Sequence, residues 1–276
     1  MGNRAQVKLP ISAIVVGLDE GYLLRNCLAS LNFCSELIYV DLGSHDDSVL
    51  IAQELATTVT HHDLVPIGEY VVAKLVNDLK HDWVLFLDPD EVLDSILQND
   101  IAKLFEQDKI SDTIGVISAP EVYYFKNRLL NGTPWGGVRG RLLIAHRRRF
   151  KFSAEVHRGR ELNTGFEQLP LQTEGIIHHY WSSSWKSLFR KHRRYLKLEG
   201  RSLYSTGQRI SLGGVVVALP NRLVSTFRES WKISDGMRGF LLCLFWVWYK
   251  SAAQFSLWSY QRELVSHSER EQREKQ

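Results

Sequence analysis

Three carboxylates directly follow an apolar run in the stretch DWVLFLDPDEV, residues 82–92. The run at 84–87 has the composition of a buried strand, and the acids after it are Asp88, Asp90 and Glu91. Pro89 makes a rigid exit from the strand, and if the strand continued, Asp88 and Asp90 would point the same way. Such a pair suits a hard cation such as Mg²⁺ or Mn²⁺, able to act as a Lewis acid for a diphosphate leaving group. A solvated acidic turn is the alternative.

A second polar joint lies in IYVDLGSHDDS, residues 38–48. Asp41 ends an apolar run, Gly43 permits a tight turn, and Ser44 follows before a helical pattern. A carboxylate here can accept hydrogen bonds from a ribose or a base, while the turn offers backbone N–H groups. Asp46 is equally well explained as a helix-capping residue.

Apolar runs alternate along the chain with segments of helical spacing, and these elements must position the polar residues described above. The runs 11–16, 36–42, 57–62 and 83–88 are typical of strands, and the segments 22–31, 46–56 and 70–80 carry helical spacing. This alternation predicts an α/β fold with a mostly parallel sheet covered on both faces. Ligands of such sheets bind beyond the carboxyl ends of the strands. Leu18–Glu20, Asp41–Ser44 and Asp88–Glu91 are therefore expected along one rim.

Composition sets broad limits on the class of protein. The 276 residues are 44% hydrophobic and 24% charged, which excludes a disordered chain and suits one large domain, alone or with an extension. The 3 cysteines argue against a disulfide scaffold or a zinc site and fit a reducing compartment. The N-terminal apolar run is closed by Asp19 and Glu20, and we interpret it as a first core strand, not a signal peptide.

Charge is unevenly distributed, although the net charge is only +3. Basic residues gather at 139–160 and again at 186–201, which suggests an anionic partner such as phosphate, nucleic acid or a membrane surface. A solvated basic face is the alternative. Residues 240–260 hold one charge in 21 positions and many aromatic rings, which favours an interfacial helix over a spanning one. Packing on the protein's own core remains open.

Taken together, ISAIVVGLDE, IYVDLGSHDDS and DWVLFLDPDE resemble family 2 glycosyltransferases of the GT-A (Rossmann-like) fold, and most of all the bacterial lipopolysaccharide-core glucosyltransferase type. The resemblance covers about residues 10–200. Two later segments agree with it: GRLLIAHRRRFKFSAEVHRG, and IIHHYWSSSWKSLFRKHRRY. We therefore expect a transferase domain over 1–200 and a helical, possibly membrane-interfacial extension over 201–276.

The resemblance implies an inverting transfer from a nucleotide sugar, with a UDP-sugar favoured. It assigns the nucleoside to Asp41 and the metal and diphosphate to Asp88 and Asp90, with His157 completing the metal site or contacting the diphosphate. The cofactor-binding candidates are Asp19, Glu20, Asp41, Gly43, Ser44, Lys74 and Asp88. The chain departs from the family pattern at Asp19, His45, Asp47 and Arg158, and Lys74 and Asn77 are only shifted matches to an expected Arg-Asn element.

An inverting transfer needs a base beside the acceptor hydroxyl. Glu155 is the first candidate, with Asp90 the other catalytic residue, and Glu121 is the second candidate for the base. Structural roles for His157, His178 and His179 stay open. Trp135 lies in a glycine-rich loop that could stack on a sugar or close over it, and an aromatic side chain on a surface loop without such a role is the alternative.

These patterns predict a metal-dependent glycosyltransferase with Mg²⁺ or Mn²⁺ and a nucleotide sugar as its cofactors. Its acceptor would be a lipopolysaccharide or another surface glycan, lipid-linked glycans included. Arg147–Arg149 and Arg190–Arg194 would dock it on the inner face of the cytoplasmic membrane, with no nucleic-acid partner. The alternatives are a sugar nucleotidyltransferase, whose glycine-rich loop is missing, and a non-catalytic protein that binds membranes or nucleic acid.

Overall fold

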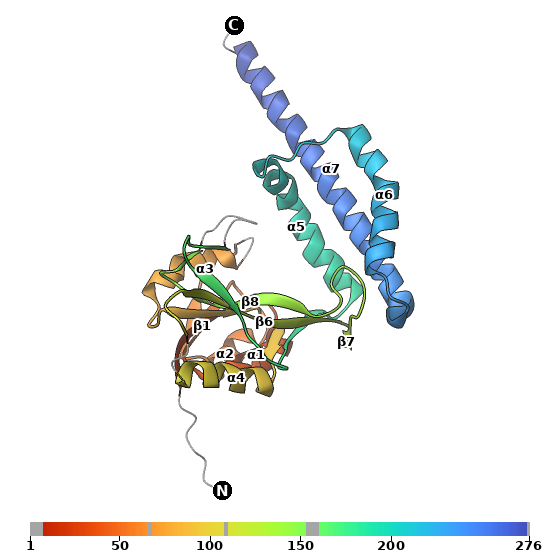
Figure 1. Ribbon diagram of the computed structural model, residues 1–276. Coiled ribbons are helices and arrows are strands. Elements are labelled where there is room, and N and C mark those ends of the chain that lie inside the picture. The colour runs from red at the N-terminus through yellow and green to blue at the C-terminus, as the bar shows by residue number, and fades with distance from the viewer. Residues whose placement is uncertain (1–7, 66–67, 108–109, 153–159, 275–276) are drawn as a thin grey trace. The chain divides into compact units, whose positions relative to one another are not determined.

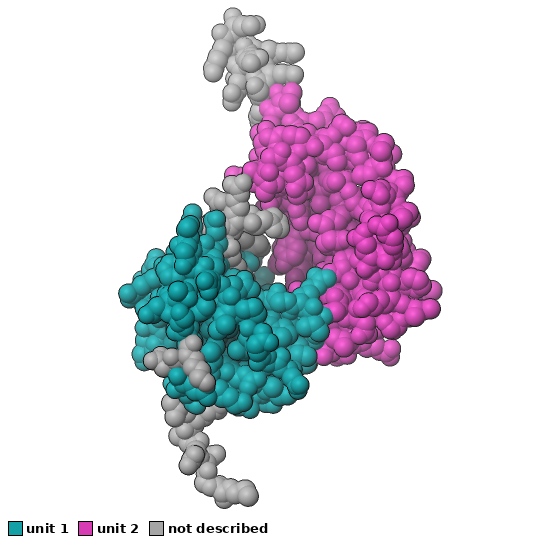
Figure 2. All heavy atoms as spheres, in the orientation of Figure 1, with its two compact units in different colours: residues 1–122, 138–181 teal, residues 123–137, 182–276 magenta. Residues whose placement is uncertain are grey.

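The computed structural model describes residues 8–65, 68–107, 110–152 and 160–274, and the chain forms two compact units (Figures 1 and 2). The first unit holds residues 1–122 and 138–181, and the second holds residues 123–137 and 182–276. The expected boundary at residue 200 falls inside helix α5 (Trp185–Ser205), which belongs to the second unit.

A mixed ten-stranded sheet organises the first unit, and its main path runs β3-β2-β1-β4-β8-β6-β12-β5. The strands of this path are β1 (Leu9–Gly17), β2 (Cys34–Asp41), β3 (Thr58–His61), β4 (Trp83–Leu87), β5 (Glu91–Leu93), β6 (Ile114–Phe125), β8 (Arg139–His146) and β12 (Ile177–Ser182). β7 (Arg128–Leu129) and β11 (Glu167–Pro170) pair with β6 outside this path, and β9 (Phe150–Phe152) pairs with β10 (Arg160–Leu162) in a separate ribbon.

The predicted α/β fold is confirmed, and its parallel part is the N-terminal half. β1 pairs in parallel with β2 and β4, and β2 with β3, whereas β8 runs antiparallel to both β4 and β6. The sheet is thus more mixed than expected. The N-terminal strands are apolar and β-branched, which suits strands buried on both faces.

Helices cover both faces of this sheet (Figure 1). One face is packed by α1 (Gly21–Ser30), α2 (Ser48–Leu55) and α4 (Ser95–Glu106), whose buried side chains Leu24, Ala52 and Leu97 join the strand residues. The other face is packed by α3 (Glu69–Leu75), followed by the short helix η1 (Val76–Asp78), through Val71, Val72 and Val76. This double cover leaves the strand ends as the open edge of the sheet.

The second unit is a layer of helices in which α7 (Gly236–Glu274) packs against both α5 and α6 (Leu212–Ser230). The short helix η2 (Ile233–Asp235) joins α6 to α7, and the buried Asp235 carboxylate accepts backbone hydrogen bonds from Asn131 and Gly132. Within the described residues, Ile233–Ser266 is long and apolar enough to cross a membrane by length and composition. It contains an 18-residue window with a mean hydropathy of 1.2, of which 39% is buried.

Candidate active site

Three strand ends form one rim, as the sequence predicts. The register pairs Gly17 of β1 with Asp41 of β2, and Asp41 with His61 of β3. On the other side of β1, Val15 pairs with Leu87, the last residue of β4. The loops that follow β1, β2 and β4 therefore leave the sheet side by side, and each carries a carboxylate.

The turn after β2 is built around the Asp41 side chain. Its carboxylate accepts backbone hydrogen bonds from Gly43 at 3.0 Å and from Ser44 at 3.1 Å. Gly43 has a φ of 97°, a conformation that favours glycine. Burial alone raises the pKa of Asp41, but hydrogen bonds from Ser44, Gly43 and His61 outweigh it and lower the pKa. The turn thus uses its own N–H groups to hold Asp41 ionised at the rim.

The loop after β1 is tied to the same turn. The Asp19 carboxylate accepts from the backbone N–H of His45 at 2.7 Å, and the Asp19 N–H donates to the Ser44 hydroxyl at 3.0 Å. Asp19 has a φ of 54°, which is uncommon outside glycine, so these bonds fix a strained backbone. The Glu20 N–H donates to the Ser48 hydroxyl at 3.3 Å. Both predicted loops therefore form one hydrogen-bonded ledge.

Asp46 has a structural role that the sequence left open. Its carboxylate accepts from the backbone N–H of Gly21 at the start of α1 at 2.9 Å, and from the N–H of Ser48 at the start of α2 at 3.0 Å. The single Asp46 carboxylate thus caps two helices, α1 and α2, which begin in different loops. The capping interpretation of Asp46 is correct.

The LDPDE stretch is a tight turn, not a continued strand. The N–H of Glu91 donates to the carbonyl oxygen of Asp88 at 2.9 Å, and the N–H of Asp88 donates to the Glu91 carboxylate at 2.7 Å. Because the chain turns here, its acids do not share one side: Asp88 is exposed, whereas Asp90 and Glu91 are 4% and 1% exposed. The expectation that the two aspartates point the same way, which assumed a continuing strand, does not apply.

Behind this turn lies a buried network of charged side chains. β12 pairs antiparallel with β5 and sets His179 directly opposite Glu91. The His179 ring lies 3.5 Å from the Asp90 carboxylate, 3.3 Å from Glu91 and 3.2 Å from Glu121. Arg141 of β8 pairs with Glu91 at 2.7 Å and with Glu121 at 3.4 Å. Four strands and the turn before β5 thus supply one cluster of three carboxylates and two basic groups.

The charges in this network are close to balance. Burial alone lowers the pKa of His179, but Asp90, Glu121 and Glu91 outweigh it and raise the pKa to about 10. Burial raises the pKa of Glu91 to about 8, although the Arg141 guanidinium opposes that rise. For Glu121, burial is outweighed by His179 and Arg141, and its pKa is lowered. A protonated His179 and Arg141 therefore offset most of the carboxylate charge.

Two places could hold a divalent cation. Glu91, Glu121 and His179 have ligand atoms within 4.8 Å of one another, and oxygen and imidazole donors suit Mn²⁺. However, a cation there would compete with Arg141 and require His179 to lose its proton. Asp88, by contrast, is exposed at the rim. It is the one acid of this turn that is exposed, whereas Asp90 and Glu91 belong to the buried network.

Other predicted residues lie elsewhere or outside the described chain. Lys74 is exposed on α3, where its ammonium lies 4.4 Å from the centre of the Tyr70 ring. Glu155 and His157 fall in 153–159, outside the described residues. Trp135 is 9% exposed and packs against Trp246 with ring centres 5.1 Å apart. A lid or stacking role for Trp135 is therefore wrong in this structure, because its ring belongs to the core of the second unit.

In the first basic block, the arginines at 147–149 form ion pairs within their own unit. Arg147 pairs with Asp82 at 2.7 Å, and Arg149 pairs with Asp112 at 2.9 Å while donating to the carbonyl of Ile114. Arg148 is 73% exposed and lies 3.3 Å from Asp82. Two of these three arginines thus fix loops of the sheet unit and are poorly placed to dock on a membrane.

Sequence reasoning missed two residues around the site, His61 and Arg141, and left the role of a third, His179, open. His61 ends β3 with its ring 3.4 Å from the Asp41 carboxylate. Arg141 and His179 join the buried network only because β8 and β12 enter the sheet beside β4 and β5. A signal for His61 was present, since it lies near the end of the predicted strand 57–62. The two others follow from strand order, which their local sequence does not reveal.

Comparisons with known proteins agree with the predicted resemblance to glycosyltransferases. An "Uncharacterized glycosyltransferase" of Rickettsia bellii is 34% identical over 97 residues, 34% of this chain and 32% of that protein. The "Lipopolysaccharide core biosynthesis glycosyltransferase LpsC" of Rhizobium meliloti is 31% identical over 101 residues, 35% of this chain and 37% of that protein. The chain thus spans about a third of the length of these curated relatives.

No protein-family model matches the chain. Among solved structures, glucosyl-3-phosphoglycerate synthase from Mycobacterium tuberculosis with Mn²⁺, UDP and glucosyl-3-phosphoglycerate is 16% identical, with 74% of this chain and 82% of that chain covered and a TM-score of 0.45. That score is too low to place any site residue. The curated relatives therefore carry the comparison: over about a third of its length, this chain resembles glycosyltransferases.

Proposed function

We propose that the chain is an inverting glycosyltransferase that moves a sugar from a nucleotide-sugar donor to a surface-glycan acceptor. The observation that carries the proposal is the rim: Asp19, Asp41 and Asp88 follow three neighbouring parallel strands, where α/β sheets bind ligands. The glycosyltransferase names of the curated relatives support the reaction class, and the lipopolysaccharide-core name of one supports the acceptor class.

The donor's nucleoside would bind at the ledge formed by the first two loops. Asp41 is ionised and fixed by Gly43 and Ser44, so it can accept a hydrogen bond from a ribose hydroxyl or a base N–H without reorganising. Asp19 is fixed by His45 and borders the same ledge, and Glu20 begins the next helix. A UDP-sugar is the donor we propose, and the pyrophosphate would extend from this ledge toward Asp88.

We propose that Asp88 and Asp90 hold a divalent cation, Mg²⁺ or Mn²⁺, for which the Asp90 carboxylate would have to turn from His179 toward the rim. Such an ion supplies a Lewis acid that stabilises the charge of the departing diphosphate. The chain's part is to fix the ligands: Glu91 holds the backbone N–H of Asp88, and His179 lies 3.5 Å from the Asp90 carboxylate. Arg141 pairs with Glu91 behind the turn, and this ion pair offsets the cost of burying the Glu91 carboxylate there.

The acceptor hydroxyl would attack the anomeric carbon while the diphosphate leaves, and a base would take the hydroxyl proton. We propose Glu155 for this base, with His157 contributing to the cation or the diphosphate. Glu121, the second candidate, is 4% exposed and paired with Arg141 and His179, so it positions neighbours instead of reaching an acceptor. A lipid-linked glycan on the inner face of the cytoplasmic membrane is the acceptor class we propose.

Thermal unfolding with a panel of nucleotide sugars, with and without Mn²⁺, tests this function. A ligand that binds only the folded state raises the melting temperature by mass action. We expect a rise with a UDP-sugar that needs Mn²⁺ in the wild type and is lost in Asp88→Asn. No stabilisation by any nucleotide sugar, with the protein folded, would contradict the proposal.

A further inference from the structure

The helix α6 turns an uncharged face outward. Its exposed apolar side chains recur at helical spacing, with exposed fractions of 64% for Val216, 77% for Val217 and 61% for Val224. The one charge between Leu212 and Phe227 is Arg222, which is half-buried and donates to the Ser251 hydroxyl of α7 at 2.7 Å. The charged Arg222 side chain thus faces the protein while the valines of α6 face outward, which is the reverse of the pattern of a surface helix in a water-soluble protein.

This apolar surface continues onto α7. The exposed residues of its first half fall at spacings of three, four and seven: Met237, Phe240, Leu241, Leu244, Trp248 and, further on, Phe255. The Phe240 ring lies 5.1 Å from Phe227 at the end of α6. Ile233, in the turn between the helices, is 85% exposed. α6, the turn and α7 therefore all contribute exposed apolar side chains to the same helical layer, and clustered exposure of this kind marks an interaction surface.

The helix α5, in the same layer of helices, exposes mainly charged side chains instead of apolar ones. Its exposed cations recur at helical spacing: Lys186, Arg190, Arg193, Arg194 and Arg201. Its acid, Glu199, is turned inward and accepts a hydrogen bond from the Tyr249 hydroxyl of α7 at 2.6 Å. Unlike the basic block of the sheet unit, this stripe includes four cations for which the described residues supply no ion pair: Lys186, Arg190, Arg193 and Arg194.

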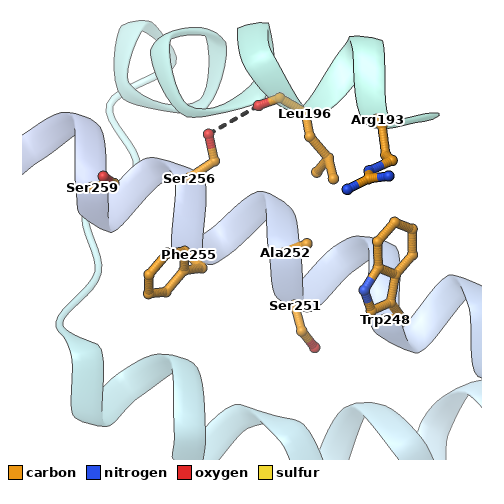
Figure 3. A pocket seen from close by; sticks show the side chains of 8 residues that line it. All are labelled: Arg193, Leu196, Trp248, Ser251, Ala252, Phe255, Ser256 and Ser259. Carbon is orange, nitrogen blue, oxygen red and sulfur yellow. Dashed lines mark hydrogen bonds between the residues drawn. The ribbon is translucent and has the colours of Figure 1, made fainter. Parts of the chain in front are cut away.

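The cationic stripe of α5 and the apolar stripe of α7 meet at a groove between the two helices (Figure 3). Arg193 and Leu196 of α5 line it together with Trp248, Ala252 and Phe255 of α7. Figure 3 shows the Arg193 guanidinium beside the Trp248 indole. A cation from the α5 stripe therefore lies next to the apolar stripe of α7, so the two stripes can face one planar partner.

We propose that this surface inserts into the face of a bilayer rich in anionic phospholipid, with α6, the turn and the α7 stripe among the acyl chains and the α5 cations at the headgroups. Apolar burial and attraction to anionic lipid are the two signals that together give stable peripheral binding. The exposed cations would repel the same stripe of a second copy, which disfavours a homodimer. The proposal specifies the membrane partner suggested under the proposed function.

The packing of α5 also decides the orientation. α5 lies along α7, with the Ser256 hydroxyl donating to the Leu196 carbonyl at 3.0 Å and the His192 and Phe245 rings 4.9 Å apart. If α7 crossed the bilayer with this packing intact, the α5 cations would enter the hydrocarbon, at a high cost. α7 therefore lies along the membrane surface, although its length alone would allow it to span.

Vesicle flotation of the full chain tests the surface. With vesicles containing phosphatidylglycerol, we expect the wild type to bind, and Val217→Asp with Val224→Asp to weaken partitioning by at least about tenfold, because two apolar contacts are replaced by charges. Leu50→Asp is the matched control, since Leu50 is 61% exposed on α2 of the sheet unit. Arg190→Gln with Arg194→Gln should weaken binding to these vesicles while leaving the weaker binding to phosphatidylcholine vesicles unchanged.

A site-specific probe separates insertion from mere proximity. The three native cysteines are buried, so Val217→Cys can be labelled selectively with an environment-sensitive dye. We expect a blue shift on adding anionic vesicles, and none for dye at Leu50→Cys. Equal binding by the Val217/Val224 variant, no blue shift, or a dimer that this variant dissociates would each overturn the proposal. Neither assay needs turnover, so the membrane surface and the transferase activity can fail separately.

Discussion

The two units treat apolar and charged residues in opposite ways. In the sheet unit, the strands are buried and the few charges inside are paired, as Arg141 is with Glu91. In the helical unit, valines of α6 face outward while Arg222 turns inward. The first pattern is expected of a domain that folds in water. The second pattern is the observation behind our proposal that the helical unit lies against a membrane surface.

The largest expected effect comes from breaking the buried network of the sheet unit. Arg141→Ala leaves Glu91 and Glu121 buried without their guanidinium, which should lower the free energy of unfolding by about 3–5 kcal/mol. Urea titration followed by circular dichroism measures the change. Arg148→Ala is the control, because Arg148 is 73% exposed and its surface pair should contribute no more than about 1 kcal/mol. Equal losses in both variants would contradict the buried network.

Next comes the exposed acid of the rim. Asp88→Asn should lower donor turnover by about 100-fold, or roughly 2.7 kcal/mol in transition-state stabilisation, because one cation ligand is lost. The free energy of unfolding should change by less than about 0.5 kcal/mol, since Asp88 is exposed. Steady-state kinetics with varied Mn²⁺ and urea titration measure the two effects. Asp78→Asn, at another exposed acid, should change neither.

Acid should weaken the helical unit through His192. This side chain is 6% exposed, and burial holds its pKa below the ordinary value of 6.5. The unfolded chain therefore binds a proton that the folded chain resists, so stability is full above about pH 6.5 and falls as the pH drops below it. The loss is at most about 1.4 kcal/mol per pH unit. Thermal unfolding between pH 7.5 and 5.5 measures it, and His192→Gln should flatten the dependence.

The smallest effect should come from the outward valines. Val217→Ser, at a side chain that is 77% exposed, should change the free energy of unfolding in water by less than about 0.5 kcal/mol. Val84→Ala, at a fully buried strand residue, should cost about 2 kcal/mol from lost burial and the cavity left behind. Urea titrations compare the two. A large loss for Val217→Ser would mean that α6 is buried against protein and not available to lipid.

Much of the sheet unit could be predicted from local pattern. Apolar β-branched runs alternate with helical spacing, and carboxylates follow the runs, so the parallel order and the rim of Asp19, Asp41 and Asp88 follow from general rules of α/β sheets. The turn at Pro89 was also predictable as a rigid exit. The direction of the Asp90 and Glu91 side chains was not, because it depends on a turn hydrogen bond and on strands from later in the chain.

The helical unit was predicted only in part. The aromatic density of residues 240–260 indicated an interface, but the exposure of α6 was not predictable. An apolar stretch such as 212–227, in which Arg222 is the one charge, looks the same in sequence whether its apolar face is buried or exposed. Likewise, Trp135 in a glycine-rich loop gave no sign that it would pack on Trp246. Contacts with α7 decided both, and the contact of Trp135 with Trp246 joins residues more than a hundred positions apart.

The sequence by itself determined the fold class, the rim and the reaction class that the rim suggests. These features depend on strands and on the polar residues that directly follow them, which are neighbours in the sequence. Only the tertiary structure decided which acids stay exposed, which become ion pairs, and which apolar faces remain outside. Those outcomes depend on what packs against each side chain. Asp88 at the rim and Glu91 beneath it, three residues apart, have different roles for that physical reason.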